Sequence, residues 1–266
     1  MEFGLNEDQK MMRDAAREFA EAKIKPLEME IDETEEWPRE LIKEMADLGF
    51  LGMIIPEEFG GSGLDFVTMC VVAEEITKAS AAVSMTMGLH NSLVGLPFVD
   101  YGTKEQNDKY LTKLATGEIF GCFALTEPNA GSDAGNQQTT AVLDGDEWVI
   151  NGRKQFITNA PVSDVAVLFT TTSPGKGARG MTCFAVDCKA PGFSIGTIEK
   201  KMGLHGSPTS EVIIEDMRVP KDAVLGKVNR GFRVAITTID AARAGVAAQC
   251  VGVCQRALEE SITYAK

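Results

Sequence analysis

Four short clusters of polar and small residues have the types and spacing that a cofactor or substrate site requires. In the first, Leu125–Asp133, the hydroxyl residues Thr126 and Ser132 flank a Pro/Gly turn that follows an apolar run, Phe120 to Leu125. A rigid turn of this kind directs hydroxyls and backbone N–H groups into a cleft while exposing little bulk. The cluster predicts a binding site, with an ordinary surface turn as the alternative.

The other three clusters follow in order along the chain: Lys154–Asn159, Met202–Glu211 and Asp240–Arg243. Together the four resemble the FAD-dependent acyl-CoA dehydrogenases, most nearly the short-chain, butyryl-type members. Four motifs in this order are far more specific than any one of them, and the resemblance runs the whole length of the chain. We therefore expect a flavin-dependent oxidoreductase.

The resemblance implies that the first two clusters bind FAD, through Phe123, Ala124, Leu125, Thr126, Gly131, Ser132, Phe156, Ile157 and Thr158. Thr126 would hydrogen-bond the pyrimidine side of the isoalloxazine ring, and Thr158 would lie at N5. Phe156 stands where many members have Trp, which keeps an aromatic wall but loses an indole N–H. Taken alone, Phe156–Thr158 is as typical of a buried strand, and its pairing with the first cluster favours the cofactor role.

By the same resemblance, the CoA part of an acyl-CoA substrate contacts Ser132, Asp240, Ala241, Ala242 and Arg243. Asp240 and Arg243 share a helix face, so a surface ion pair is the alternative. Arg suits the CoA role because its guanidinium is a planar fork of donors. An apolar tunnel for the acyl tail is expected on a helical stretch, with core packing as the alternative for its residues: Val83, Met85, Met87, Leu89, Leu93, Val94, Leu96 and Phe98.

The expected reaction is α,β-dehydrogenation of a short or medium acyl-CoA to the 2,3-enoyl-CoA, with electrons passed to an electron-transfer flavoprotein. A carboxylate removes the α proton. Most relatives place it far downstream, and some place it where this chain has Ala242. We therefore expect no catalytic residue within the chain, a Glu or Asp downstream of Lys266, and no activity from residues 1–266 alone. The alternatives are an acyl-CoA oxidase, a nitroalkane-oxidase-like enzyme, or a non-catalytic acyl-CoA- or flavin-binding relative.

Composition excludes several other classes of function. The net charge is -13, and no Lys/Arg cluster is dense enough to follow nucleic-acid phosphates. No apolar run approaches the roughly 20 residues of a membrane helix, and Met1–Leu5 shows no signal-peptide pattern, which leaves the cytoplasm as the default compartment. The six cysteines form no C-x-x-C pair and the two histidines lie far apart, so no metal site is expected. Cys250 and Cys254, four apart on one helix face, are expected in the core.

Periodicity predicts an α+β protein of three domains: an N-terminal helical domain (1–118), a middle domain with an antiparallel or mixed sheet (119–230), and the first helix of a C-terminal helical bundle (231–266). Helix starts are expected at Asn6, Pro38, Asp65 and Thr103. Expected strands are Phe120–Thr126, Thr139–Leu143, Glu147–Ile150, Val165–Thr171, Met181–Val186 and Glu211–Val219, with turns at Asp144-Gly145 and Asn151-Gly152.

From Phe232 the helical period continues to Lys266 without a Gly, Asn or Pro stop at its end. We therefore expect the chain to end inside a helix. The resemblance implies that this helix is buried between subunits of a homotetramer and that the FAD site is completed across that interface.

Overall fold

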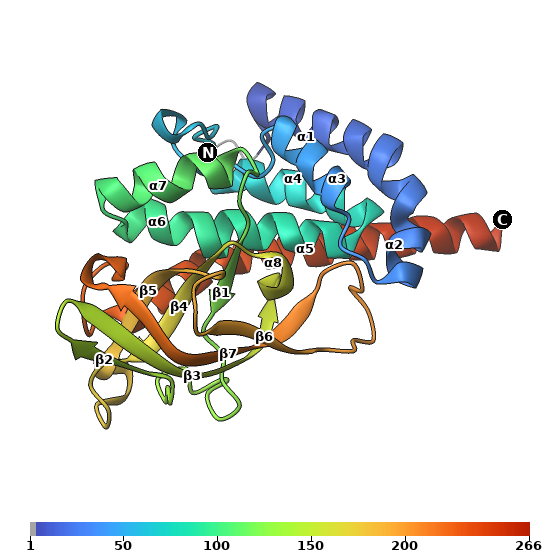
Figure 1. The fold of residues 1–266 in the computed structure, drawn as a ribbon. Coiled ribbons are helices and arrows are strands. Elements are labelled where there is room, and N and C mark those ends of the chain that lie inside the picture. The colour runs from blue at the N-terminus through green and yellow to red at the C-terminus, as the bar shows by residue number, and fades with distance from the viewer. Residues whose placement is uncertain (1–3) are drawn as a thin grey trace.

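A layer of helices lies over a twisted β-sheet in the computed structural model, which describes residues 4–266 (Figure 1). Residues 1–3, part of the segment that shows no signal-peptide pattern, lie outside the described range. The mixed α+β architecture agrees with the fold class expected from the sequence.

Four of the N-terminal helices, α1, α3, α4 and α7, begin where the sequence predicts a helix start. The Asn6 and Gln9 side chains, and the Thr103 and Gln106 side chains, each form a reciprocal capping box, while Asp65 accepts the N–H of Thr68. The helices are α1 (Glu7–Phe19), α2 (Glu28–Thr34), α3 (Arg39–Asp47), α4 (Phe66–Ala79), α5 (Ala81–Leu89), α6 (Leu96–Tyr101) and α7 (Lys104–Ala115).

Helices α5 and α6 form one continuous rod, the α5–α6 rod, between the other helices and the sheet (Figure 1). A π-helical turn, His90–Gly95, joins α5 to α6 without a break in the rod. Such π turns are frequent at functional sites because they re-aim the side chains around them. Ser92 and Leu93 in this turn face a cleft that is described below.

The sheet has seven strands: β1 (Gly121–Ala124), β2 (Thr140–Asp144), β3 (Glu147–Thr158), β4 (Val165–Thr171), β5 (Met181–Asp187), β6 (Phe193–Ile198) and β7 (Thr209–Pro220). The strand order is β1-β4-β2-β3-β7-β6, with β5 also paired to β4. β1 pairs with β4 in parallel, whereas β3 pairs antiparallel with both β2 and β7. The sheet is therefore mixed.

Both faces of the central strand β4 are buried. Val165, Val167 and Phe169 pack in a core shared with the α5–α6 rod and α7, while Ala166 and Leu168 pack in a core on the other face. This explains why the strand is a continuous apolar run. The shared core fixes the sheet against the helices.

Two sequence expectations for the sheet are wrong. Asn151-Gly152 is not a turn, because β3 runs through it to Thr158 with a register shift between Ile150 and Gly152. Gly152 has φ +155°, and a Cβ there would clash with Thr139, so the glycine serves a close approach within the sheet. The sequence also missed β6, an edge strand that is largely exposed and so lacks a clear hydrophobic pattern.

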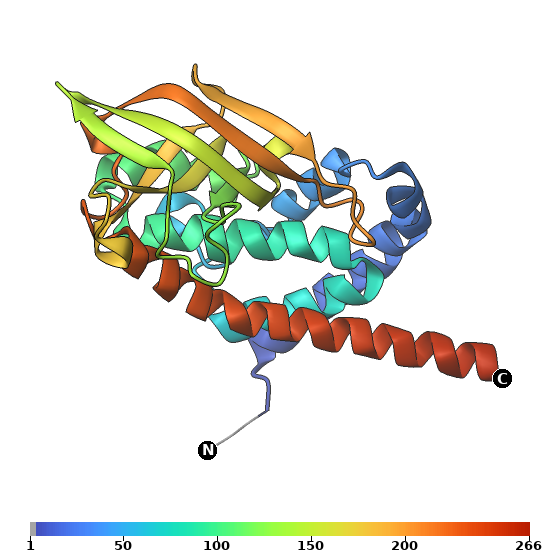
Figure 2. The same cartoon turned by 90° about the horizontal axis from the view of Figure 1, so that it is seen from below.

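The last helix, α8 (Gly231–Ala265), extends past the other elements at its C-terminal end (Figure 2). Its inner face packs on α4 and α5, with Gly252 close against Thr77. Cys250 and Cys254 are exposed on the outer face, so the expectation that they lie in the core is wrong. By length and composition alone α8 would also be able to cross a membrane, but Ala242 and Gln249 are buried against neighbouring helices.

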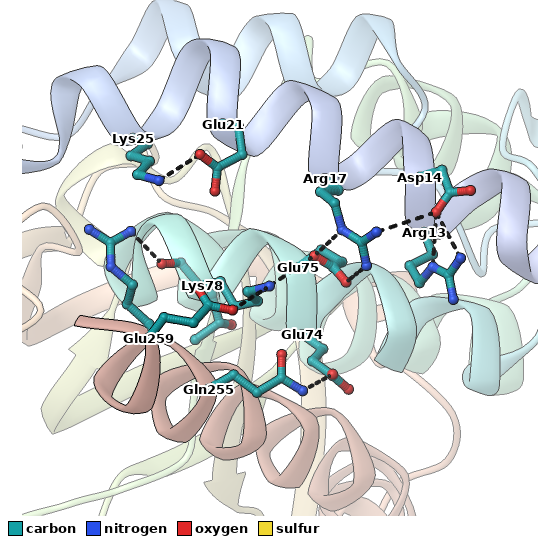
Figure 3. A network of polar contacts seen from close by, with 12 residues as sticks. Arg13, Asp14, Arg17, Glu21, Lys25, Glu74, Glu75, Lys78, Gln255 and Glu259 are labelled. Atoms are coloured by element: carbon teal, nitrogen blue, oxygen red, sulfur yellow. Dashed lines mark hydrogen bonds and ion pairs between the residues drawn. The ribbon is translucent and has the colours of Figure 1, made fainter. Parts of the chain in front are cut away.

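A polar network fastens α8 and α1 to α4 (Figure 3). Arg17 of α1 donates two hydrogen bonds to the carboxylate of Glu75, which is 5% exposed, over 2.7 and 3.1 Å. Lys78 lies between Glu75 and Glu259 of α8, at 3.7 and 3.3 Å. The network lies on the side of α4 away from the sheet.

Candidate functional site

The first two clusters lie side by side where β1 ends and β3 bulges. The N–H of Gln155 donates to the carbonyl oxygen of Thr126 over 2.8 Å. Two residues of β3, Gln155 and Phe156, face the single residue Glu211 of β7, which makes a β-bulge. Bulges of this kind re-aim side chains next to active sites.

The bulge turns Phe156 out of the sheet. Its backbone has φ +57°, a strained conformation for an aromatic residue, and its side chain is 61% exposed. The alternative that Phe156 belongs to a buried strand is therefore wrong, whereas its neighbour Ile157 is buried. An exposed ring held in this way is available as an apolar wall.

A buried ion pair between Lys154 and Glu127 connects the two clusters. Lys154 is 0% exposed, and its ammonium lies 2.7 Å from Glu127 Oε1, 2.5 Å from Gln137 Oε1 and 3.2 Å from the Leu125 carbonyl. Burial lowers the pKa of Lys154 to about 8, against the opposing pull of Glu127. Burial alone would raise the pKa of Glu127, but the charge of Lys154 and hydrogen bonds bring it below its ordinary value. The pair is therefore ionised at neutral pH.

The third cluster supports the end of β3. Thr158 pairs with Thr209, and the N–H of Asn159 donates to the Pro208 carbonyl over 2.7 Å. The hydroxyl of Thr86 on α5 lies 3.3 Å from the Asn159 side chain. Contacts from β7 and α5 thus fix Thr158 at the boundary between sheet and helices.

An apolar cleft of about 130 Å³ opens beside Thr158. Four of its residues, Ala242, Gly245, Val246 and Gln249, follow the spacing of one face of α8. The rest of the lining comes from α4 and the α5–α6 rod: Met69, Ala73, Met85, Gly88, Leu89, Ser92 and Leu93. Through Thr158, the second cluster (Lys154–Asn159) reaches this cleft.

The acyl tunnel expected on the α5–α6 rod stays a prediction, and only some of its residues line this cleft. Of the eight apolar residues expected on the rod, only Met85, Leu89 and Leu93 line the cleft. The other five are buried in the cores, namely Val83, Met87, Val94, Leu96 and Phe98. The sequence missed the contribution of α4, and no signal in the sequence pointed to it.

The residues expected to contact CoA do not face one common space. Asp240 and Arg243 are exposed, 67% and 74%, and lie 3.4 Å apart as a pair. Ala241 packs toward the N-terminal core, and Ala242 faces the apolar cleft. A separate hollow of about 280 Å³ contains Ser132 together with residues of α8, Phe232 and Ile236. Ser132 therefore lies beside the first turns of α8, whereas the Asp240–Arg243 pair lies further along the same helix.

The two histidines make structural contacts: His90 lies in the core, and His205 connects the third cluster to α2. His90 is fully buried, donates its Nε2–H to the Leu114 carbonyl over 2.9 Å, and has a pKa lowered by burial to about 4. His205, in the third cluster, reaches Asp32 of α2 and the Lys201 carbonyl. Within residues 4–266, no three His, Cys, Asp or Glu side chains are arranged to hold a metal ion.

Three family models match consecutive parts of the chain. They are the acyl-CoA dehydrogenase N-terminal domain over residues 6–118, the middle domain over 122–217 and the C-terminal domain over 229–266. The chain belongs to the acyl-CoA dehydrogenase family. The resemblance drawn from the four clusters is confirmed, and the protein is an FAD-dependent oxidoreductase.

Similar acyl-CoA dehydrogenase family members differ in the direction named for their reaction. The chain is 43% identical to a short-chain-specific acyl-CoA dehydrogenase of Clostridium acetobutylicum, over 100% of this chain and 70% of that protein. It is 47% identical to a caffeyl-CoA reductase–Etf complex subunit of Acetobacterium woodii, over 98% of this chain and 69% of that protein.

Solved acyl-CoA dehydrogenase structures share the fold. Butyryl-CoA dehydrogenase from Megasphaera elsdenii superposes with a TM-score of 0.97 at 38% identity, covering 100% of this chain and 70% of that one. An acyl-CoA dehydrogenase of Bacillus anthracis complexed with FAD superposes with a TM-score of 0.92 at 37% identity, covering 98% of this chain and 45% of that one.

The residues of this acyl-CoA dehydrogenase fit a flavin. Over the described part of the chain, the hydroxyls of Thr126 and Thr158 find no hydrogen-bond partner, and both side chains are half-buried. Phe156 stands exposed between them along the sequence. Two free donors and an exposed apolar ring are the groups that the polar edge and flat face of an isoalloxazine require.

Proposed function

We propose that this protein catalyses α,β-dehydrogenation of a short or medium acyl-CoA to the 2,3-enoyl-CoA and passes the electrons to an electron-transfer flavoprotein. One observation carries the proposal. Thr158, in the second cluster (Lys154–Asn159), lines the same apolar cleft as Leu93 and Ala242. A group beside the cofactor therefore borders the space where an acyl chain would lie, which is the juxtaposition this chemistry requires.

We assign FAD binding to the residues expected from the sequence, with Thr126 and Thr158 as the hydrogen-bonding side chains and Phe156 as the apolar wall. Bound FAD supplies a two-electron acceptor for the hydride that leaves the β carbon. The cleft excludes water from the acyl chain because its lining is largely apolar. Ser132, Asp240 and Arg243 are proposed to hold the CoA part, where their exposure suits a large polar ligand.

The proton at the α carbon needs a base within hydrogen-bond reach. None of the residues that line the cleft in the described chain carries a carboxylate, and Ala242 presents a methyl group there. We therefore propose that a Glu or Asp downstream of Lys266 removes this proton.

A second candidate is the reverse reaction on an aromatic enoyl-CoA. The cleft is close in size to an engineered apolar cavity of about 150 Å³ that binds benzene. Met69 and Met85 line it, and thioethers make favourable contacts with aromatic rings. The similarity to a caffeyl-CoA reductase subunit supports the same candidate.

We also propose a homotetramer in the cytoplasm, divided into domains at residues 1–118, 119–230 and 231–266. The exposed apolar residues on the distal half of α8, among them Val251, Val253 and Leu258, support burial of this helix by further helices or subunits. The six free cysteines support a reducing compartment.

Anaerobic titration of the yellow holoenzyme, from the full-length gene, with a panel of acyl-CoAs tests the proposal. Bleaching of the flavin by butyryl- or hexanoyl-CoA is the expected result. Oxygen consumption during turnover would point instead to an oxidase, and no bleaching by any acyl-CoA would point to a non-catalytic relative. Reoxidation of the chemically reduced enzyme by cinnamoyl-CoA, faster than by crotonyl-CoA, would favour the aromatic candidate.

A further inference from the structure

Lys154 is a fully buried charged residue beside the two clusters, and the proposed function gives it no role. Its side chain is fully buried and directs its ammonium at three acceptors, on Glu127, Gln137 and Leu125. Burying an ion pair costs desolvation, and well-packed apolar residues often stabilise a fold as well or better. Stability alone is therefore a weak reason for a lysine at this position.

The most informative of the three bonds is the one to the peptide before Thr126. The Leu125 carbonyl accepts from both Lys154 Nζ and Gln137 Nε2, each over 3.2 Å. A trans peptide is planar, with its C=O and N–H on opposite sides. Because the carbonyl is held toward the buried ammonium, the N–H of Thr126 must point the opposite way.

The next carbonyl is held as well, since Thr126 O accepts the N–H of Gln155 over 2.8 Å. The peptides on both sides of Thr126 are therefore fixed by bonds to β3 residues. The N–H and the hydroxyl of Thr126 are left without a hydrogen-bond partner among residues 4–266. Two donors thus remain free, and the N–H points away from Lys154.

We propose that Lys154 is a positioning residue for the flavin: by holding the Leu125 carbonyl, it directs the N–H and hydroxyl of Thr126 at the polar edge of the isoalloxazine. This inference rests on the proposed flavin role of Thr126. Lys154 itself does not touch the cofactor. Glu127 keeps the ammonium in place and is itself held by the N–H groups of Gln138 and Thr139.

The test compares Lys154→Met with a matched control, Lys78→Met, in the full-length protein. Lys78 also pairs with a buried carboxylate, Glu75, but lies on α4 and not in either of the clusters assigned to FAD. FAD affinity is measured by titrating apoprotein with FAD, and the visible spectrum and midpoint potential of the bound flavin are recorded beside the melting temperature. Lys154→Met is expected to weaken FAD binding about tenfold, as the loss of one or two hydrogen bonds predicts, and to shift the spectrum and potential. Lys78→Met is expected to lower the melting temperature only.

A double-mutant cycle with Thr126→Val then tests whether Lys154 acts through the Thr126 hydroxyl, which valine removes, or through the N–H, which valine keeps. If it acts through the hydroxyl, the double variant weakens FAD binding by clearly less than the product of the two single effects, and if it acts through the N–H alone, the effects multiply. Should Lys154→Met fail to fold, Gln137→Leu replaces it in the cycle, because it removes the second donor to the same carbonyl. A smaller shift of FAD affinity and spectrum in the same direction is then expected.

The inference is overturned if Lys154→Met, or Gln137→Leu in its place, leaves the FAD affinity, spectrum and potential as in the wild type. Such a result would make the pair purely structural. A wild-type protein that cannot be loaded with FAD would instead contradict the proposed function, so the two failures are distinguishable.

Discussion

Gln155 donates its backbone N–H to the Thr126 carbonyl over 2.8 Å, and this bond joins two clusters that are far apart in the sequence. It connects the loop after β1 to the bulge in β3. The bulge in turn leads to Thr158, which borders the cleft. The loop after β1 and the strand β3 therefore form one site, in which the bulge re-aims the side chains of β3.

Thr158→Val is expected to alter flavin reduction more than FAD binding. The variant keeps the shape of the side chain but removes the hydroxyl, a loss of about 1 kcal/mol or roughly fivefold in the rate of flavin reduction by acyl-CoA. Stopped-flow bleaching measures this rate. Thr209→Val is the control, since Thr209 pairs with Thr158 on β7 but does not line the cleft. Equal rates in both variants and the wild type would remove Thr158 from the site.

Arg243→Ala is expected to raise KM for acyl-CoA with little change in kcat, because an exposed arginine that holds CoA contributes equally to substrate and transition state. Steady-state kinetics of the full-length enzyme measures both constants. Arg233→Ala, an exposed arginine two to three turns earlier on α8, should leave KM unchanged. A fall in kcat at constant KM would show that Arg243 acts on the chemistry instead.

Glu75→Gln is expected to destabilise the fold by about 1–3 kcal/mol without changing the flavin spectrum. The change weakens the double hydrogen bond from Arg17 and the contact with Lys78 in the network of Figure 3. Urea unfolding measures the loss. Glu74→Gln, which perturbs only the partly buried contact to Gln255, is the comparison and should cost less.

The contact between His205 and α2 is expected to weaken as the pH rises. A hydrogen bond to the Lys201 carbonyl and then the charge of Asp32 raise the pKa of His205, and both ring nitrogens face acceptors. Because the folded pKa lies above the unfolded value of about 6.5, the stabilisation is complete below that value and is lost as pH rises through the folded pKa. Urea unfolding of wild type and His205→Gln between pH 5 and 9 checks this. The difference between the two proteins should shrink with increasing pH, and a constant difference would contradict it.

Local signals in the sequence predicted the start of most elements. The capping pairs Asn6–Gln9 and Thr103–Gln106 form as expected, because a cap depends only on residues three apart. The continuous apolar run of β4 and the helical period of α8 were equally readable. The bulge at Gln155 and Phe156 was not, since it depends on how β3 meets β7.

Features that depend on distant contacts escaped the sequence. Lys154 is a polar residue in a strand, and nothing local indicates that Glu127 and Gln137 bury it. The apolar residues of the α5–α6 rod look alike in sequence, so the packing of α8 decides that Leu93 lines the cleft while Val94 enters the core. Cys250 and Cys254 share a helix face as expected, but that face is the one turned away from α4.

Ala242→Glu is expected to place a base at the wall of the cleft, where no lining residue of the described chain carries a carboxylate. Ala242 is buried at the wall of the cleft that Thr158 also borders, and an added carboxylate would point into the space assigned to the acyl chain. Its apolar surroundings would raise its pKa toward neutrality, which suits proton removal. We expect residues 1–266 loaded with FAD to show no bleaching by butyryl-CoA, and Ala242→Glu to show slow bleaching.

Ala242→Gln is the matched control for this change, because it has the same size and cannot take the proton. Bleaching by Ala242→Glu but not by Ala242→Gln, with an increase as the pH rises through the pKa of the new carboxylate, would identify the cleft wall as a position from which a base reaches the α carbon. If residues 1–266 already reduce FAD with butyryl-CoA at the rate of the full-length protein, the base lies within this chain, and its proposed position downstream of Lys266 is wrong.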